Sequence, residues 1–304
     1  MKAVICGTGS AVPTKVLDND DLSQIVDTSD EWIRERTGIV RRHIAKEETC
    51  VSLAVEAAQK ALKQSGLSAE EIDLVIVSTI SSNVVLPGVA CEVQKKIGAV
   101  NAVCYDLSAA CTGFVLAYQN AQAYLQTGIY RSALIIGSEC LSHLVNWNDR
   151  GTCILFGDGA GAAVLRSEEG TGFLPAAHSD GSRGEALRCR SYLDGAKEWQ
   201  ISHPEEYQMQ MDGQAVFKFA VRQVPGVIRE VLDKNGLRLE EIDWIILHQA
   251  NRRIVEAVSR HLQQPLEKFP MNMQEYGNTS SASIPILLDE MNRDQKFQKG
   301  QKII

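Results

Sequence analysis

The sequence predicts an α/β protein made of two related halves. Helical stretches alternate with short apolar runs that are typical of buried strands. Residues 66–77 (GLSAEEIDLVIV) recur as residues 236–247 (GLRLEEIDWIIL), 170 positions later (236 − 66). Each copy follows a helical stretch and contains a glycine, an acidic turn and an apolar strand. We therefore expect duplicated halves, at 1–170 and 171–304, arranged with pseudo-twofold symmetry around one central site.

The predicted elements of the first half follow in a regular order. A helix at 53–64 precedes the strand of the repeat, because its apolar residues have helical spacing. Short apolar runs at 102–105 and 132–136 predict two further strands, separated by a helix that ends near Thr127. A glycine-rich strand at 156–161 completes this half.

The second half repeats the pattern but stops early. A helix at 224–234 leads to a buried strand at 244–247, and the polar stretch at 178–206 is interpreted as a connection or an insertion. At the offset of the repeat, Ile304 corresponds to Leu134, inside a first-half strand. We therefore expect the final strands of the second half to be missing, either because a tail is omitted or because the protein is truncated.

Composition and charge exclude several classes of function. The 304 residues, 44% of them hydrophobic, can bury a large core, and the net charge of −7 argues against nucleic-acid binding. Neither a signal peptide nor an apolar run of about 18 residues is present, so we expect no membrane span and a cytoplasmic location. Eight scattered cysteines indicate free thiols and no metal site. The glycine clusters at 7–9 and 157–161 lack dinucleotide-binding spacing and are interpreted as tight turns.

One cysteine lies at a predicted junction between a strand and a helix. Cys111 stands among small residues in 107–114 (LSAACTGF), with an apolar run before it and a helical pattern after it. In the first turn of a helix, free backbone N–H groups and the helix dipole lower the pKa of a thiol. Cys111 is therefore the candidate nucleophile, although a single cysteine is more often a buried core residue.

A histidine and an asparagine lie at comparable places in the second half. His248 follows the strand at 244–247, at the carboxyl end where open α/β sheets place ligand-binding groups. Asn278 lies in the small, polar loop 276–283, which leads into another helix. Either residue alone could be an ordinary hydrogen-bonded or turn residue. The agreement of all three placements favours one site formed by Cys111, His248 and Asn278.

These segments resemble β-ketoacyl-acyl-carrier-protein synthase III, the initiating condensing enzyme of bacterial fatty acid synthesis. The resemblance extends from 7–10 (GTGS) to the last residues and includes 149–152 (DRGT) and 155–161 (LFGDGAG). It implies the thiolase-like, layered α-β-α-β-α fold, with Cys111 accepting the acyl group. It also implies that His248 and Asn278 promote decarboxylation. Family members typically continue with a glycine-rich strand whose backbone N–H completes the oxyanion hole.

The residue types suit the implied chemistry. A Cys111 thiolate attacks a thioester through an oxyanion, for which its own backbone N–H is a candidate donor, and an acyl-enzyme remains. Decarboxylation of a malonyl thioester then gives an enolate that imidazole and carboxamide groups can stabilise, with no metal or redox cofactor. A second histidine in place of Asn278 would resemble elongating condensing enzymes, and a cysteine thiolases. Chalcone-synthase-like enzymes share the triad but are longer chains.

The resemblance also implies which residues bind the substrates. Trp32 and Arg150 match the pair that sandwiches the adenine of coenzyme A, and Arg36 matches a residue near its phosphates. Asn251 is a candidate contact for the pantetheine arm. Leu86 stands where a bulky phenylalanine often borders the acyl pocket, so we expect a roomier pocket, although one residue does not fix the length or branching of the primer.

A carrier protein and a second copy of the chain are the implied partners. Arg253 matches the basic residue that docks the acidic acyl carrier protein, and Arg252 adds a charge that either strengthens this contact or is solvated. We expect a homodimer from the resemblance alone. Two other functions stay open: a papain-like hydrolase, which also uses Cys, His and Asn, and a catalytically weak acyl-binding protein. The primer and the pathway are not fixed by the sequence.

Overall fold

The fold is layered around a mixed sheet of five strands in the order β1-β7-β6-β4-β5. The computed structural model describes residues 1–191 and 207–304. In the sheet β4 runs parallel to β5 and β6, whereas β7 is antiparallel to β1 and β6. Short antiparallel pairs join β2 to β3 and β8 to β9. The strands are β1 Lys2–Ala11, β2 Val16–Asp18, β3 Arg41–His43, β4 Leu74–Ser78, β5 Val103–Leu107, β6 Ser132–Glu139, β7 Gly159–Glu168, β8 Leu187–Arg188 and β9 Gln210–Met211.

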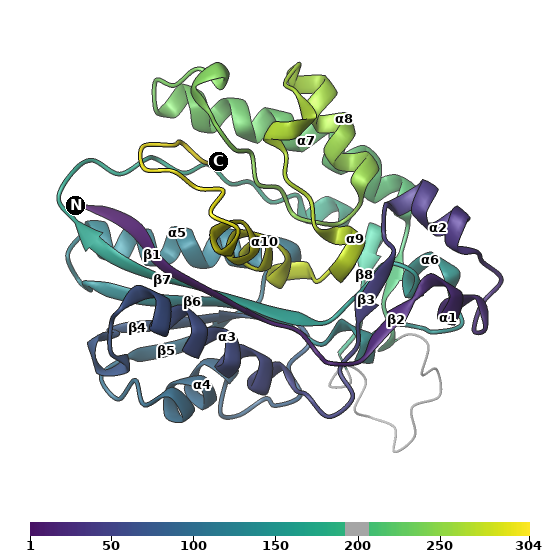
Figure 1. Cartoon of the computed structure of the whole chain (residues 1–304), viewed down its shortest axis with the longest axis horizontal. Coiled ribbons are helices and arrows are strands. Elements are labelled where there is room, and N and C mark those ends of the chain that lie inside the picture. The colour runs from purple at the N-terminus through teal and green to yellow at the C-terminus, as the bar shows by residue number, and fades with distance from the viewer. Residues whose placement is uncertain (192–206) are drawn as a thin grey trace.

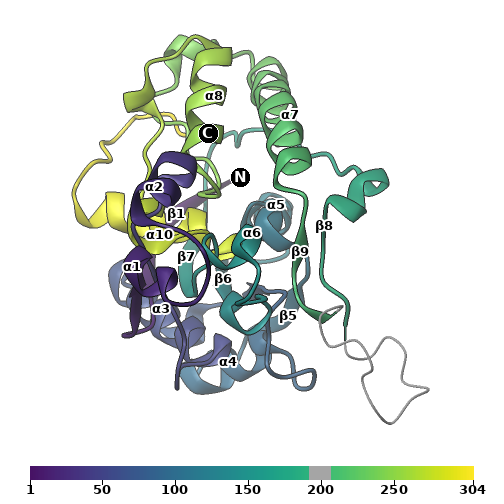
Figure 2. The ribbon, with the colours of Figure 1, turned by 90° about the vertical axis from the view of Figure 1, so that its right-hand side faces the viewer.

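Helices cover both faces of this sheet. Figures 1 and 2 show α3 and α4 on one face, α5 and α10 on the other, and α7 and α8 beyond α10. The helices of the described residues are α1 Asn19–Ser23, α2 Asp30–Thr37, α3 Cys50–Ser65, α4 Val89–Ile97, α5 Gly113–Gln126, α6 Arg150–Cys153, α7 Gly213–Lys234, α8 Arg252–Leu262, α9 Met273–Tyr276 and α10 Ser283–Arg293. No helix in this part of the chain is long and apolar enough to span a membrane.

The continuous apolar runs of the sequence are strands buried on both faces. In β4, Val75 and Val77 pack with α3 and α4, whereas Leu74 and Ile76 pack with α5. Each strand residue therefore meets a helix on one side or the other, which removes the usual alternation of apolar and polar residues. The predicted strands at 102–105 and 132–136 are confirmed as β5 and β6, and the helix that ends near Thr127 is α5.

The repeat is visible in the structure of both halves. The helix α3 ends at Gly66, whose φ is +74°, and α7 ends just before Gly236, whose φ is +61°. A single 3-10 turn follows in each case, at Ala69–Glu71 and Leu239–Glu241. The helix α7 begins well before the predicted residue 224, because Asp212 caps it by accepting from two backbone N–H groups.

The predicted strand at 244–247 is wrong as a ladder strand, although the segment is extended. Trp244 forms an isolated parallel bridge with Ile303, and the backbone N–H groups of Ile245 and Ile246 donate to Lys268 and Ile304. Most of its main-chain bonds go to residues 302–304, which run parallel to it, but the pairing is limited to a single bridge. Ile245 packs with α7 and α8, whereas Ile246 packs with α10, so the segment still separates two helical layers.

The glycine clusters correct another expectation. Gly9 lies in β1, and a Cβ atom there would stand 2.3 Å from the carbonyl oxygen of Ala57 in α3. Gly161 lies in β7, and its Cβ would stand 2.6 Å from the backbone nitrogen of Ile286 in α10. These glycines are therefore not tight turns. They let helices approach the sheet backbone closely from both faces.

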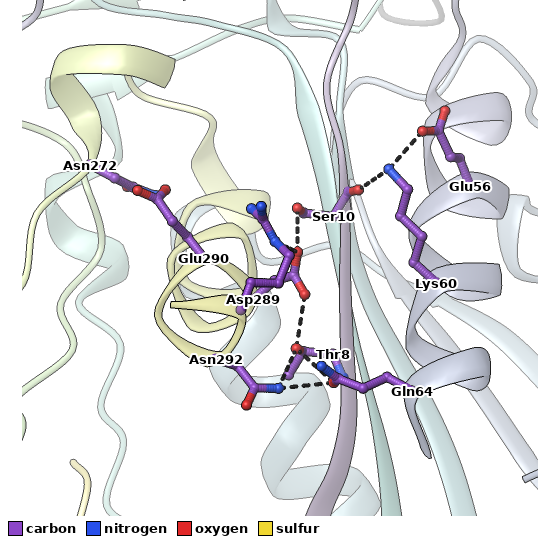
Figure 3. A network of polar contacts seen from close by, with 10 residues as sticks. Thr8, Ser10, Glu56, Lys60, Gln64, Asn272, Asp289, Glu290 and Asn292 are labelled. Atoms are coloured by element: carbon purple, nitrogen blue, oxygen red, sulfur yellow. Dashed lines mark hydrogen bonds and ion pairs between the residues drawn. The ribbon is translucent and has the colours of Figure 1, made fainter. Parts of the chain in front are cut away.

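A buried polar network ties the second half to the first, as Figure 3 shows. The Asp289 carboxylate in α10 accepts hydrogen bonds from Thr8 Oγ1 at 2.9 Å and Ser10 Oγ at 2.6 Å in β1. Arg293 pairs with the same carboxylate at 3.1 Å, and Asn292 Nδ2 donates to Gln64 of α3 at 2.9 Å. The network fixes α10 along β1. The predicted boundary between the two halves, at residue 170, stays a prediction.

We expect Asp289→Ala to lower the free energy of unfolding by about 1–3 kcal/mol, because it removes the buried carboxylate that accepts from the Thr8 and Ser10 hydroxyls. Urea titration measures this change. The matched control is Glu56→Ala, which removes an exposed carboxylate paired with Lys60 and should cost less than about 0.5 kcal/mol. Equal losses in the two variants would contradict a special role for the network.

Candidate active site

Cys111 lies in a sharp turn between β5 and α5. The 3-10 turn η2 Ala110–Thr112 leads directly into α5, so the cysteine precedes the first residue of the helix by two positions. Ala110 has a φ of +46°, a left-handed conformation that non-glycine residues rarely adopt. Gly113 has no room for a side chain, because a Cβ atom there would stand 1.7 Å from Ser78 Oγ. The turn therefore brings Cys111 close to the end of β4.

The equivalent turn of the second half meets this one. The 3-10 turn η8 Ser280–Ala282 precedes α10 as η2 precedes α5, and Ser280 has a φ of +48°. Ser281 occupies the position equivalent to Cys111, and its carbonyl oxygen would stand 2.3 Å from a Cβ atom on Gly137 in β6. The two halves thus place their strained turns against each other, as the predicted pseudo-twofold symmetry requires.

The structure changes the expectation for the Cys111 thiol. Burial raises the pKa of Cys111 to about 11, and a backbone N–H only partly opposes this shift. The predicted lowering by the helix N-terminus is therefore outweighed by desolvation. At neutral pH the resting thiol is protonated, so its proton must leave during the reaction.

The imidazole of His248 is uncharged, and one of its two nitrogens has no hydrogen-bond partner among the described residues. Its Nδ1 lies 2.6 Å from Ser283 Oγ, on the first residue of α10. Its Nε2 is buried and has no hydrogen-bond partner among the described residues. Burial lowers the pKa of His248 to about 4, so the imidazole is uncharged at neutral pH.

Asn278 is held rigidly beside the same turn. Its Oδ1 accepts from the backbone N–H of Ser280 at 2.9 Å, and its own backbone bridges to Phe156. This bridge consists of bonds to the Leu155 carbonyl and from the Gly157 N–H, at 2.8 and 3.0 Å. The amide Nδ2 is left without a partner in the described part of the chain. His248 and Asn278 are therefore held by the start of α10 and by η8, and the turn of Cys111 packs against η8.

Glu139 is a feature of the site that our sequence reasoning missed. This buried carboxyl group ends β6 and lies 2.8 Å from Ser281 Oγ, on the turn that faces Cys111. Burial raises its pKa despite several hydrogen bonds. The available signal was an acidic residue directly after a fully buried strand, a position at which a charge is costly.

The predicted adenine-binding residues lie together on the surface. Trp32 and Arg36 share one face of α2, with the guanidinium of Arg36 5.0 Å from the indole ring centre. Arg150, at the start of α6, lies 4.6 Å from the same ring and donates to the Asp27 carbonyl. The three side chains therefore form a positively charged platform, in which both guanidinium groups lie over the indole ring.

Two further residues that were predicted to contact the substrate, Asn251 and Leu86, lie in positions that favour this role less. Asn251 caps α8, since its Oδ1 accepts from Arg253 N at 2.8 Å while its Nδ2 donates to the Arg36 carbonyl at 3.1 Å. Its amide is thus occupied in joining α8 to α2. Leu86 is 87% exposed. Both roles stay predictions.

The two arginines at the start of α8 differ in their surroundings. Arg252 packs on Gly38 and pairs with Glu256 at 2.7 Å, which offsets its charge. Arg253 is exposed, forms no ion pair with a described residue, and lies 5.9 Å from the ring of Phe217. Arg253 is therefore the more available positive charge for an acidic partner.

Comparison with known proteins places this geometry in a family. Residues 105–181 match the family model described as 3-oxoacyl-[acyl-carrier-protein] synthase III, and residues 232–304 match the model of its C-terminal part. The beta-ketoacyl-[acyl-carrier-protein] synthase III of Clostridium acetobutylicum is 46% identical, with coverage of 99% of this chain and 93% of that protein. The enzyme of that name from Clostridium novyi is 45% identical, covering 98% and 92%.

Solved structures agree with the fold. The 3-oxoacyl-[acyl-carrier-protein] synthase III of Aquifex aeolicus superimposes with a TM-score of 0.92 at 44% identity, covering 99% of this chain and 94% of that one. A priming β-ketosynthase from the R1128 polyketide pathway gives a TM-score of 0.94 at 33% identity, covering 99% and 91%. The fold is thus the predicted thiolase-like one. Since sequence and structure agree over nearly the whole chain, it belongs to the β-ketoacyl-[acyl-carrier-protein] synthase III family.

Proposed function

We propose that this chain initiates fatty acid synthesis by condensing an acyl-CoA primer with malonyl-acyl-carrier-protein. The observation that carries the proposal is the packing of the Cys111 turn against η8, where Ser280 holds Asn278 and Ser283 holds His248 so that Nε2 of the imidazole stays free. The names of the relatives supply the reaction class and the carrier protein. A cytoplasmic location belongs to the same proposal.

The first step transfers the acyl group to Cys111. The sulfur attacks the thioester carbonyl, a C–S bond to Cys111 forms, and the C–S bond to coenzyme A breaks. The thiol proton leaves with coenzyme A as its thiol, so the step is balanced.

The second step forms the carbon–carbon bond. Malonyl-acyl-carrier-protein loses CO₂, and the electron pair of the broken bond becomes an enolate. His248 and Asn278 donate to the enolate oxygen, and its carbon attacks the acyl carbonyl. The bond to Cys111 then breaks, and the departing thiolate recovers a proton from solvent. Neither step calls for a metal or a redox cofactor.

The hydrogen-bond partners of His248 favour the tautomer that this step needs. Ser283 Oγ receives the backbone N–H of Gln249 at 3.3 Å, so its own hydrogen is available to His248 Nδ1. Nδ1 then accepts, and the ring proton resides on Nε2. A neutral imidazole with a free Nε2–H is a suitable donor to an enolate.

Substrate binding follows from the surface around the site. The platform of Trp32, Arg36 and Arg150 suits an adenine ring and phosphates, through stacking and cation-π attraction. We assign Arg253, helped by Arg252, to docking of the acyl carrier protein. The assignment rests on exposed positive charge at the start of α8.

A homodimer is part of the proposal. The edge strand β5 has no partner on its outer side among the described strands, and its Val103 is 50% exposed. Val85 and Leu86 are also exposed. An unpaired edge with apolar residues nearby favours pairing with a second copy. Leu86 would then be covered and could border an acyl pocket.

Substitution of the three anchored residues should separate the half-reactions. Cys111→Ala is expected to abolish acyl-enzyme formation, measured by intact mass after incubation with acyl-CoA. His248→Ala and Asn278→Ala should still load, but lose malonyl decarboxylation by about 10²-fold or more, because each removes a donor to the enolate. Cys91→Ala, an exposed thiol, is the control and should behave as wild type. A stable acyl adduct on Cys111→Ala, or equal loss of loading and decarboxylation in His248→Ala and Asn278→Ala, would contradict the assignment.

Removal of single charges should distinguish the two arginines. Arg253→Gln is expected to raise the KM for malonyl-acyl-carrier-protein at low salt by about threefold or more, with acyl-CoA loading unchanged. Arg252→Gln is the matched control and should have a smaller effect, because Glu256 already offsets that charge. Steady-state kinetics at two salt concentrations measure both. An unchanged KM for Arg253→Gln would contradict the docking role.

Stability should depend on pH through His248. Its pKa is about 4 in the folded protein and near 6.5 when unfolded, so the unfolded chain takes up the proton first and stability falls as pH decreases through this range. We expect wild type to lose about 2 kcal/mol more than His248→Gln between pH 7 and pH 5, measured by urea unfolding. Parallel losses in both proteins would show that the imidazole is not held neutral.

A further inference from the structure

Glu139 is buried next to Cys111, yet the proposed mechanism does not use it. Its Oε2 accepts from the backbone N–H of Ile80 at 3.1 Å and from Ser81 Oγ at 2.5 Å. Ser81 Oγ itself accepts from the backbone N–H of Cys140 at 2.8 Å, so its hydrogen is directed to Glu139. Thr79 Oγ1 adds a contact at 3.3 Å. Oε2 therefore acts purely as an acceptor.

The other carboxyl oxygen has a different environment. Among the described residues, Oε1 has one hydrogen-bond partner, Ser281 Oγ at 2.8 Å, and Ser281 Oγ also lies 3.0 Å from the carbonyl oxygen of Ser78. A hydroxyl has one hydrogen, and a carbonyl can only accept. If Ser281 donates to Ser78, it must accept from Glu139. A carboxylate would leave one of these two contacts without a hydrogen.

We propose that Glu139 is a protonated carboxylic acid at neutral pH, which donates to Ser281 and so positions η8 without placing a charge beside Cys111. Burial favours this state, since desolvation raises the pKa of Glu139. No Lys, Arg or His of the described residues forms an ion pair with it. The carboxyl group of Asp158 has different hydrogen-bond partners from that of Glu139. Its oxygens accept from Ala45 N, Ser142 N and Ser142 Oγ, an arrangement that suits a carboxylate.

The neutral state matters because thiols surround this carboxyl group. Cys111, Cys50 and Cys140 are the titratable groups that face it, and a negative charge on Glu139 would raise the pKa of each. Without that charge, the Cys111 thiolate and the enolate oxygen form without repulsion from Glu139. Glu139 is thus a positioning residue. The effect of Glu139 on the reaction rate rests on the proposed acyl transfer. The protonation state of Glu139 does not depend on that proposal.

Infrared spectroscopy of the whole protein tests the protonation state. At neutral pH we expect a carbonyl stretch of a protonated carboxylic acid that shifts when the protein contains glutamate labelled with ¹³C at the side-chain carboxyl. The band should be lost in Glu139→Gln and kept in Glu56→Gln, a control that removes an exposed carboxylate. Ser281→Ala should raise its frequency, because the acid loses its acceptor. Absence of the labelled band from wild type would overturn the proposal, whether or not Glu139→Gln folds.

Alkylation of Cys111 gives a second readout that needs no acyl substrate. We expect wild type and Glu139→Gln to show the same pH dependence of iodoacetamide labelling at Cys111, followed by peptide mass spectrometry. If Glu139 were ionised, removal of its charge would shift labelling to lower pH by about one unit or more. Such a shift, with none in Glu56→Gln, would refute the neutral state. A failed condensation assay alone would instead count against the proposed function.

Discussion

The contact between two left-handed turns, at Ala110 and Ser280, is the constraint on which the site depends. Each turn ends a strand-like segment and starts a helix, and neither half alone supplies both the sulfur and its partners. The close approach leaves no space for side chains at Gly113 and Gly137, where Ser78 and Ser281 already stand. The positive φ angles cost energy, and packing of the halves against each other offsets that cost.

Burial gives the site its electrostatic character. His248 is neutral because its pKa falls to about 4, and Cys111 is protonated because its pKa rises to about 11. The resting site thus holds few charges of its own. Negative charge arises only during the reaction, in a medium where a fixed donor is worth more than in water. The same reasoning explains why an acidic residue can stand beside Cys111 only if it remains uncharged.

The sequence predicted the arrangement of helices and strands better than the properties of individual groups in the site. Continuous apolar runs at β4 and β6 and the repeated segment identified buried strands and two halves, because these patterns depend on neighbours close in the chain. The prediction of a strand at 244–247 was wrong because the segment is not part of a β-ladder. Strand pairing depends on which distant segments lie beside it. Gly9 and Gly161 were misassigned to turns, because spacing alone does not distinguish a turn from close helix packing.

Predictions for individual groups failed where burial decided the outcome. The thiol pKa of Cys111 is set by packing against a turn 170 positions away, which a local helix argument ignores. Glu139 escaped notice for the same reason. By contrast, Trp32, Arg36 and Arg150 were found through resemblance, and the structure brings them together.

The network around Asp289 also bears on how the protein is made. Thr8 and Asp289 are 281 positions apart, and Asn292 reaches back to Gln64 across 228 positions. Such contacts form late, because the ends of a very long loop must first meet. During synthesis the first-half sheet can assemble on the ribosome while α10 is still inside the exit tunnel. Until that helix emerges, His248 lacks its contact with Ser283, so under the proposed function the nascent chain carries the nucleophile before its site is complete.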